Sequence, residues 1–308
     1  MARHFDDVML GSIELFCLSA ERGSFTAAAA AASLTPAAVS RSIARLEARL
    51  GVRLFTRTTR HVALTAAGEA YFAQCRQALN QLVEAERAAG GAQAAPSGTV
   101  RLSLPTPYAH HRVLPLLPAF RAKHPGIRLD VHVDNRNVDF AAEGFDLALR
   151  ARALPDSGLV ARKLEDAGLV VVATPAYLRR HRMPRTPADL AAHDCIRFAL
   201  PSTGQPIDWQ FRADGADLEV PVDGGILCAQ DVLAAVTLVR HGGGLLQTYR
   251  FIVEDDLARG TLKEVLAPYA GRSRPMSLVY PAQRHMPLRV RVLIDYLVAR
   301  LSGAGARA

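Results

Sequence analysis

Residues 88–98, with the sequence AAGGAQAAPSG, divide the chain into two parts of different character. This segment lacks large side chains and concentrates Gly, Ala and Pro, so it cannot bury a core and indicates a linker. Before it, apolar residues recur at helical spacing almost throughout; after it, short alternating runs are interleaved with helical stretches. At 308 residues, the chain is long enough for two or three domains.

The part before the linker predicts three helices in quick succession. The first two end at Gly23 and near Ala32. Thr35 as N-cap and Pro36 at the first helical position predict the start of the third helix, which Gly51 ends. The buried stripes of the first and third helices are Met9, Ile13, Phe16 and Ala20, and Val39, Ile43, Leu46 and Leu50.

The outward face of the third helix is suited to DNA. Its N-terminal turn has small residues that permit close approach in a major groove. Ser40 and Arg41 are the candidates for base contact, since Arg can pair bidentately with guanine. A merely solvated helix face is the alternative explanation of Arg41, Arg45 and Arg49. The predicted contacts on this helix are Thr35, Pro36, Ala37, Ser40, Arg41 and Arg45.

Residues 54–64 predict a hairpin with a basic, hydroxyl-rich tip, which would grip phosphates through Arg57, Thr58 and Arg60. Residues 41–60 contain six Arg against the single Glu47, a local balance of +5. The net charge of +8 for the whole chain says less, because Arg outnumbers Lys 34 to 3 and such a skew often reflects genome base composition. The local patch therefore favours DNA binding more strongly than the bulk charge does.

Thr65 is expected to cap a long helix that reaches about Ala88. Four apolar residues on it repeat at 3-4-3 spacing and predict a coiled-coil seam between two chains: Phe72, Cys75, Leu79 and Leu82. Packing of this helix on its own domain is the alternative. A dimer would place two recognition helices on a pseudo-palindromic DNA site.

Strand and helix patterns alternate after the linker and predict an α/β domain with largely parallel sheets. In such sheets ligands bind at the carboxyl ends of strands. The side chains expected there are Thr106, Asp134 or Asn135, Arg150 and Arg152, Phe198, Gln230, Gln247 and Thr248. Two arginines, a hydroxyl and a helix N-terminus together suggest a small carboxylate as ligand.

The first part resembles the LysR-type transcriptional regulators over about 60 residues. The resemblance is carried by Phe16, Gly23 to Thr26, Ala28, Ala29, Pro36, Val39 to Arg41, Ile43, Leu46, Glu47, Leu50, Gly51, Leu54, Phe55, Arg57, Arg60, Leu64, Thr65 and Gly68. It continues after the linker through Leu114, Pro115, Phe120, His124, Pro125, residues 143–148, 155–157, 175–178, 187–190, 193–195 and 243–248. The alanine-rich second helix departs from the pattern, where relatives place a larger apolar residue.

The resemblance implies an all-α winged helix-turn-helix with a long linker helix, followed by a two-lobed α/β domain like the type 2 periplasmic solute-binding proteins. It implies a small-molecule effector between the lobes and a homodimer or homotetramer. The expected boundaries are residues 1–65 for the DNA-binding domain, 66–90 for the linker helix, 91–98 for a hinge and 99–302 for the effector-binding domain. Its lobes would be about 99–168 with 275–302, and 169–274; the chain would cross near Leu169 and return near Ser277.

Other classes of function have less support in the sequence. Residues 98–308 contain no GxSxG, HExxH, Walker or GxGxxG motif, so neither an enzyme, a metal site nor a cofactor is expected. A thiol redox sensor using Cys195 and Cys228, and a non-specific DNA-packing protein, remain alternatives. Asp6, Asp7 and Glu14 interrupt the apolar N-terminus, which argues against a secretion signal and for the cytoplasm.

Overall fold

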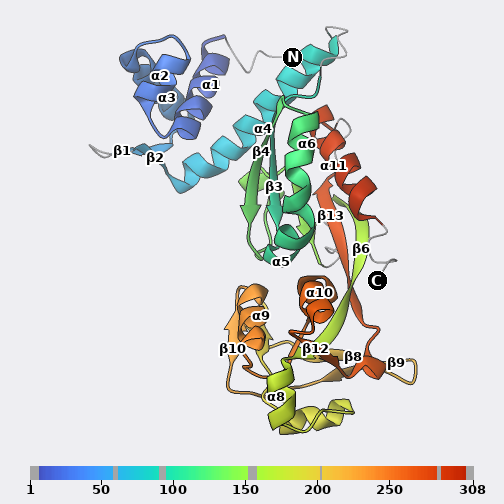
Figure 1. Cartoon of the computed structure of the whole chain (residues 1–308). Helices are drawn as coiled ribbons and strands as arrows, with labels where there is room; N and C mark the ends of the chain where they lie inside the picture. The colour runs from blue at the N-terminus through green and yellow to red at the C-terminus, as the bar shows by residue number, and fades with distance from the viewer. Residues whose placement is uncertain are drawn as a thin grey trace. The chain divides into compact units, whose positions relative to one another are not determined.

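The computed structural model describes residues 7–57, 62–89, 95–151, 158–201, 203–282 and 286–302. It divides into two compact units (Figure 1). Unit 1 comprises Met1–Ala94 and Asp139–Phe145, and unit 2 comprises Ala95–Val138 and Asp146–Ala308.

Unit 1 is a three-helix bundle with a small hairpin and a long helix. Its elements are α1 (Asp7–Arg22), α2 (Phe25–Ala31), α3 (Pro36–Leu50), β1 (Phe55–Arg57), β2 (Val62–Leu64), α4 (Ala66–Ala89) and the short α7 (Phe140–Glu143). The predicted limits of α3 are confirmed. The Thr35 hydroxyl accepts a hydrogen bond from the Ala38 N–H at 3.2 Å, and Gly51 ends the helix at φ 69°. That left-handed conformation suits glycine, which has no Cβ to clash.

The core of unit 1 forms where the predicted stripes meet. Val39, Ile43 and Leu46 are buried and Leu50 is partly buried. The Phe16 ring from α1 packs edge-on against Phe55 of β1, with 5.4 Å between ring centroids. Burial of each such large apolar side chain contributes roughly 1.5–3 kcal/mol, so this cluster holds the hairpin to the helices.

The start of α4 is locked to the hairpin. The Thr65 hydroxyl accepts a hydrogen bond from the Gly68 N–H at 2.9 Å, as an N-cap does. A Cβ on Gly68 would overlap the carbonyl oxygen of Leu54. The close approach of helix and hairpin therefore requires a residue without a side chain at this position.

Unit 2 is built around one mixed sheet. Its first elements are β3 (Gly98–Leu104), α5 (Thr106–Tyr108), the π-helical turn η1 (Ala109–Val113), η2 (Leu114–Leu116), α6 (Leu117–Lys123), β4 (Ile127–Val133), β5 (Leu147–Arg150) and β6 (Leu159–Ala173). There follow α8 (Pro175–Arg180), η3 (Pro187–Ala192), β7 (Arg197–Ala199), β8 (Trp209–Ala213), β9 (Ala216–Val220), β10 (Leu227–Ala229), α9 (Val232–Arg240) and β11 (Leu246–Tyr249). The last are α10 (Arg250–Arg259), β12 (Lys263–Val265), η4 (Ala267–Tyr269), β13 (Ser273–Pro281) and α11 (Leu288–Leu301).

The strands of the main sheet run in the order β11-β6-β13-β5-β3-β4, with β12 also paired to β6. The prediction of largely parallel sheets is wrong. Strand β3 is parallel to β4 and β5, but β13 is antiparallel to β5 and β6, and β11 and β12 are antiparallel to β6. The reason is that β6 and β13 are long strands that carry the chain out and back, so they run in opposite directions side by side.

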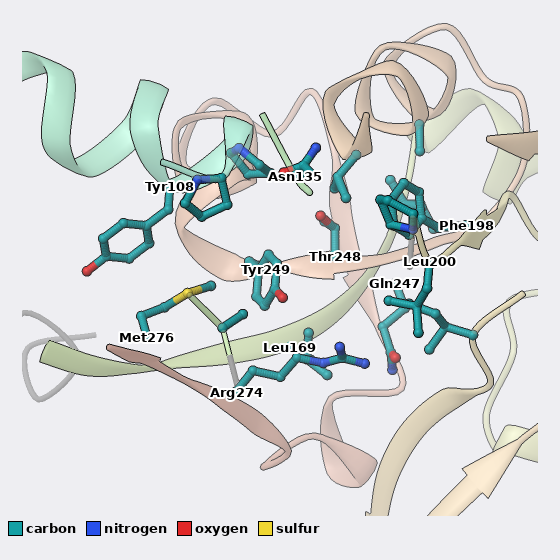
Figure 2. A pocket seen from close by; sticks show the side chains of 18 of the residues that line it. Tyr108, Asn135, Leu169, Phe198, Leu200, Gln247, Thr248, Tyr249, Arg274 and Met276 are labelled. Atoms are coloured by element: carbon teal, nitrogen blue, oxygen red, sulfur yellow. The ribbon is translucent and has the colours of Figure 1, made fainter. Parts of the chain in front are cut away.

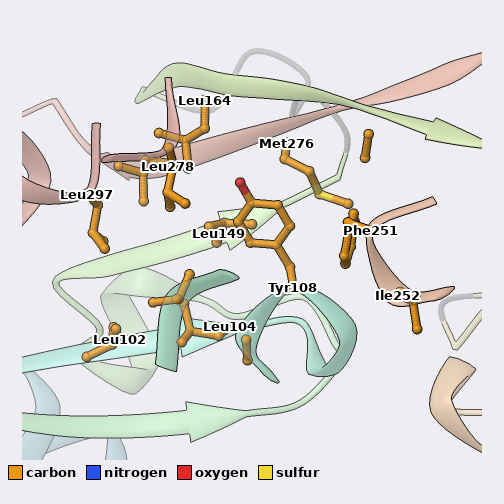
Figure 3. Close-up of a cluster of buried hydrophobic side chains, with 14 of the residues drawn as sticks. Leu102, Leu104, Tyr108, Leu149, Leu164, Phe251, Ile252, Met276, Leu278 and Leu297 are labelled. Carbon is orange, nitrogen blue, oxygen red and sulfur yellow. The ribbon is translucent and has the colours of Figure 1, made fainter. Parts of the chain in front are cut away.

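Strand β6 serves two parts of unit 2. Up to Gly168 it pairs with β13, and from Leu169 on it pairs with β11 and β12. We call the part around β3, β4 and β5 lobe I, and the part that β7 to β12 build lobe II. A large apolar core underlies the sheet and joins residues of both lobes, including Tyr108 and Phe251 (Figure 3). A smaller core in lobe II contains Trp209 and Phe211.

Candidate nucleic-acid interface and ligand cavity

The outward face of α3 presents the predicted DNA contacts to solvent. Thr35, Pro36, Ala37, Arg41 and Arg45 are exposed, and Ser40 is half-buried. Because Val39, Ile43 and Leu46 fix the opposite face in the core, this face cannot turn inward. The structure therefore brings the six helix residues of the prediction together on one accessible strip.

Glu47, the one carboxylate of the basic patch, is turned inward. It is only 6% exposed, and its Oε1 accepts hydrogen bonds from the Leu54 N–H at 2.8 Å and the Phe55 N–H at 3.2 Å. The carboxylate thereby holds the start of the hairpin. The exposed strip of α3 is left with arginine charge alone.

The hairpin predicted for residues 54–64 is confirmed in its pairing. Strands β1 and β2 are antiparallel, with Phe55 opposite Leu64 and Arg57 opposite Val62. The predicted phosphate contacts Thr58 and Arg60, and the side chain of Arg57, lie outside the described residues.

The four residues predicted for dimerisation differ in burial. Cys75 is buried, and Phe72 and Leu79 are partly buried against the core of unit 1. Leu82 is 48% exposed, as is its neighbour Val83 at 43%. The predicted seam residues of α4 up to Leu79 thus pack on their own unit, and the exposed apolar surface begins at Leu82.

Unit 2 contains a cavity of about 510 Å³ whose walls come from both lobes and from β6 and β13 (Figure 2). Its charged lining residues are Arg136, Arg150 and Arg274, and no Asp or Glu is among the described residues that line it. The rest is mostly aromatic and aliphatic. A cavity of this kind favours an anionic ligand with an apolar body.

Four of the seven predicted effector contacts line the cavity: Arg150, Phe198, Gln247 and Thr248. Thr106, Asp134 and Gln230 do not belong to the described lining. The Thr106 hydroxyl accepts from the Asn135 amide at 3.3 Å, and Asp134 forms an ion pair with Arg136 at 3.2 Å. Arg152 lies outside the described residues.

Asn135, the alternative to Asp134 in the sequence, lines the cavity and connects the two lobes. Its Oδ1 accepts from the Thr106 N–H at 3.0 Å, while its Nδ2 donates to the backbone carbonyl of Gln230. Gln230 has a left-handed backbone with φ 69°. The amide thus links the end of β4 in lobe I to the loop before α9 in lobe II.

Two of the side chains predicted to contact the effector are hydrogen-bonded to other parts of the protein. The Arg150 guanidinium, 8% exposed, donates to the Ser103 hydroxyl at 3.0 Å and to the carbonyls of Leu149 and Arg136 at 2.6 and 3.0 Å. Gln247 exchanges two 2.8 Å hydrogen bonds with the backbone of Gln210. Both side chains form the wall and hold its strands in place. Thr248 differs, because its buried Oγ1 has no hydrogen-bond partner among the described residues.

Sequence reasoning did not select Tyr108, Trp209, Arg274 and Met276, which also line the cavity. Arg274 and Met276 lie two residues apart on β13, so a period-2 pattern extended back from Leu278 would have found them. Tyr108 and Trp209 gave no such signal. Both side chains are buried, and a buried aromatic residue is equally typical of a core.

The cysteines of lobe II are not set up as reactive thiols. Burial raises the pKa of Cys195 to about 12. Burial and the neighbouring Asp231 carboxylate raise the pKa of Cys228 as well. Since the thiolate is the reactive form, both side chains are protonated at neutral pH and suited to packing.

Neither a metal cluster nor a membrane helix emerges from the described ranges. Within them, no three His, Cys, Asp or Glu side chains come together as a metal site needs. None of the helices there has the length and apolar character that a membrane crossing requires.

A helix-turn-helix with a basic hairpin, followed by an α/β unit with a ligand-sized cavity, defines a ligand-responsive DNA-binding regulator. The family model described as bacterial regulatory helix-turn-helix protein, lysR family, matches residues 10–69. The model described as LysR substrate binding domain matches residues 93–302. The chain therefore belongs to the LysR family of transcription regulators, with a DNA-binding N-terminus and an effector-binding domain.

Known relatives agree over nearly the whole chain. An HTH-type transcriptional regulator of Xanthomonas campestris pv. campestris is 37% identical over 291 residues, which cover 94% of this chain and 84% of the relative. The probable HTH-type regulator LtrA of Klebsiella pneumoniae is 35% identical, with 94% of each chain covered. The solved structure of CrgA, a LysR-type transcriptional regulator from Neisseria meningitidis, matches with a TM-score of 0.62 at 31% identity, covering 94% of this chain and 98% of that chain.

Proposed function

We propose that α3 enters the major groove and reads bases through Ser40 and Arg41, with Thr35, Pro36, Ala37 and Arg45 along the same strip. Arg57, Thr58 and Arg60 of the hairpin hold the flanking phosphates. The observation that carries this proposal is the exposed arginine strip opposite a buried stripe, from which Glu47 has been withdrawn. DNase footprinting of the purified full-length protein on its own upstream region tests it. Protection of no defined sequence there would contradict it.

We propose that the protein acts as a homodimer, or as a tetramer built from dimers, on a pseudo-palindromic promoter site. Support comes from the exposed Leu82 and Val83 on α4, which extend an apolar face beyond the part that unit 1 covers. Two chains joined there would present two copies of α3 to successive turns of the duplex. Because its proposed partner is promoter DNA, we also propose that the protein acts in the cytoplasm.

We propose that the cavity of unit 2 binds a carboxylate effector and does not transform it chemically. Three arginines and no described acidic residue in the lining support an anion, since every charged side chain of the described lining is cationic. The test is the same footprint with and without a panel of carboxylates. An effector should shift the protected region or the apparent affinity, whereas a response to neutral compounds alone would contradict a carboxylate.

A further inference from the structure

Thr248 and Arg274 are polar groups in the cavity lining that are left for a ligand. The Tyr108 hydroxyl also lacks a partner among the described residues, but Figure 2 shows it pointing away from the other labelled lining residues. Thr248 is 3% exposed, and its Oγ1 has no hydrogen-bond partner among the described residues. Figure 2 shows its side chain directed into the cavity, toward the space between Asn135 and Phe198. A buried hydroxyl without a partner is costly, because it has lost its hydrogen bonds to water.

The second free group is the Arg274 guanidinium. It lines the cavity from β13 and is half-buried, and it forms no ion pair or side-chain hydrogen bond within the described part of the chain. Three other polar side chains of the wall are already engaged by the protein. Arg150 and Gln247 donate to the protein, and Arg136 pairs with Asp134.

Between these two groups the cavity is aromatic and apolar. The Tyr249 ring is fixed by stacking on Phe251, with 5.4 Å between centroids and 10° between planes. Phe198 and Trp209 of lobe II add ring surface, and Leu169 and Met276 add aliphatic surface. Ring faces and edges favour an aromatic partner over an aliphatic one. The volume of about 510 Å³ also exceeds what a short aliphatic acid would fill.

We infer that the cavity binds an aromatic carboxylic acid with a second hydrogen-bonding group. Its carboxylate pairs with Arg274, its ring lies against Tyr249 and Phe198, and its second polar group bonds to the Thr248 hydroxyl. This inference rests on the proposed function, which requires a carboxylate but specifies neither the ring nor the second group.

Isothermal titration of the full-length protein tests it with four probes: 4-hydroxybenzoate, benzoate, cyclohexanecarboxylate and 4-hydroxybenzamide. We expect 4-hydroxybenzoate to bind most tightly. Thr248→Val should weaken its binding roughly 3- to 10-fold and leave benzoate unchanged, since one neutral hydrogen bond is lost. Thr248→Ser, which retains the hydroxyl, is the matched control. Arg274→Gln should weaken both aromatic acids about tenfold or more, and Arg274→Lys less.

Thermal unfolding of the same variants separates a ligand role from a structural one. Because the Thr248 hydroxyl has no partner, Thr248→Val should keep or raise the unfolding midpoint. A lowered midpoint would mean that the hydroxyl serves the fold, and would overturn its assignment to the ligand.

The probes also separate this inference from the proposed function. If cyclohexanecarboxylate binds as tightly as benzoate, or if Thr248→Val weakens 4-hydroxybenzoate and benzoate equally, the aromatic ligand with a second group is wrong while a carboxylate effector stands. If 4-hydroxybenzamide matches the acid, both are wrong. Binding of none of the four would overturn the aromatic assignment alone, because other carboxylates in the footprint still test the effector.

Discussion

The side chains proposed to read bases on α3 lie within residues 35–45, whereas the cavity draws its lining from residues scattered between 105 and 276. In the first region a cap, a stripe and a turn of helix place every group, so neighbours in sequence are neighbours in space. In the second, β6 and β13 bring together segments that are far apart in the sequence. A site of the first kind is encoded locally, and one of the second kind depends on the topology.

Glu47 offers the largest test of this contrast, because its carboxylate joins α3 to the hairpin only seven and eight residues further along the chain. Glu47→Ala would leave the buried N–H groups of Leu54 and Phe55 without an acceptor, at about 1–3 kcal/mol each. We expect a loss of about 2–4 kcal/mol in the free energy of unfolding, measured by urea denaturation. Glu47→Gln retains Oε1 and should lose much less. Equal stability of the Ala variant and the parent would mean that α3 and the hairpin need no such link.

The sequence predicted the local region well for the same physical reason. Thr35, Pro36 and Gly51 determine α3 through interactions within a few residues, and its boundaries followed from them. The strand directions in unit 2 did not follow, because pairing depends on the path of β6 and β13. The sequence also did not reveal which cavity side chains are hydrogen-bonded to the protein itself. The Gln247 side chain is hydrogen-bonded to the backbone of Gln210, while the hydroxyl of Thr248 beside it has no partner among the described residues. No sequence pattern distinguishes the two.

Arg41→Ala tests whether the local region alone specifies the DNA sequence. Loss of a bidentate contact to guanine should cost about 1–3 kcal/mol on the native site and relax base preference at one position. Arg57→Ala, in the hairpin, should instead weaken binding to all sequences and reduce the salt slope by about one. Competition binding with native and scrambled DNA at several salt concentrations distinguishes the two. An unchanged base preference in the Arg41 variant would show that α3 is not the reading helix.

Asp256 tests how far the helices beside the cavity depend on one ion pair, in which the carboxylate is buried and the Arg240 side chain is partly exposed. Its carboxylate accepts from Arg240 at 2.8 Å and from the Thr261 hydroxyl at 3.0 Å, joining the end of α9 to α10. Burial alone would raise the pKa of Asp256, but these two partners outweigh it and leave the pKa below its usual value. The stability it contributes is therefore present above the unfolded-state pKa of about 3.9 and is lost as the pH falls through the lower folded value.

Asp256→Asn should accordingly lower the free energy of unfolding by about 1–3 kcal/mol at pH 7. The difference from the parent should begin to close as the pH falls below about 4, and should close fully only below the lower folded-state pKa, where the folded parent carboxylate is protonated too. Chemical denaturation across that pH range measures it. Asp295→Asn is the control, since Asp295 is 62% exposed and pairs with Arg162 at 3.6 Å. A difference that stays constant with pH would mean that the charge of Asp256 contributes nothing.

The smallest effect concerns Gln230, whose backbone conformation no sequence pattern revealed. A non-glycine residue at φ 69° bears about 1–2 kcal/mol of left-handed strain, which glycine does not. Gln230→Gly removes that strain but adds about 0.5–1 kcal/mol of chain entropy in the unfolded state, so we expect a net gain in stability of up to about 1 kcal/mol. The carbonyl that accepts from Asn135 is retained in this variant.

Gln205→Gly is the matched control, because Gln205 is exposed and has no positive φ. There only the entropy changes, and stability should fall by about 0.5–1 kcal/mol. Opposite signs in the two variants, measured by thermal unfolding, would show that lobe II holds Gln230 in its strained conformation in order to present the carbonyl to Asn135. A loss in both would mean that the left-handed conformation costs this loop nothing. The hydrogen bond from Asn135 to the Gln230 carbonyl would then be made by a loop that holds its conformation without strain.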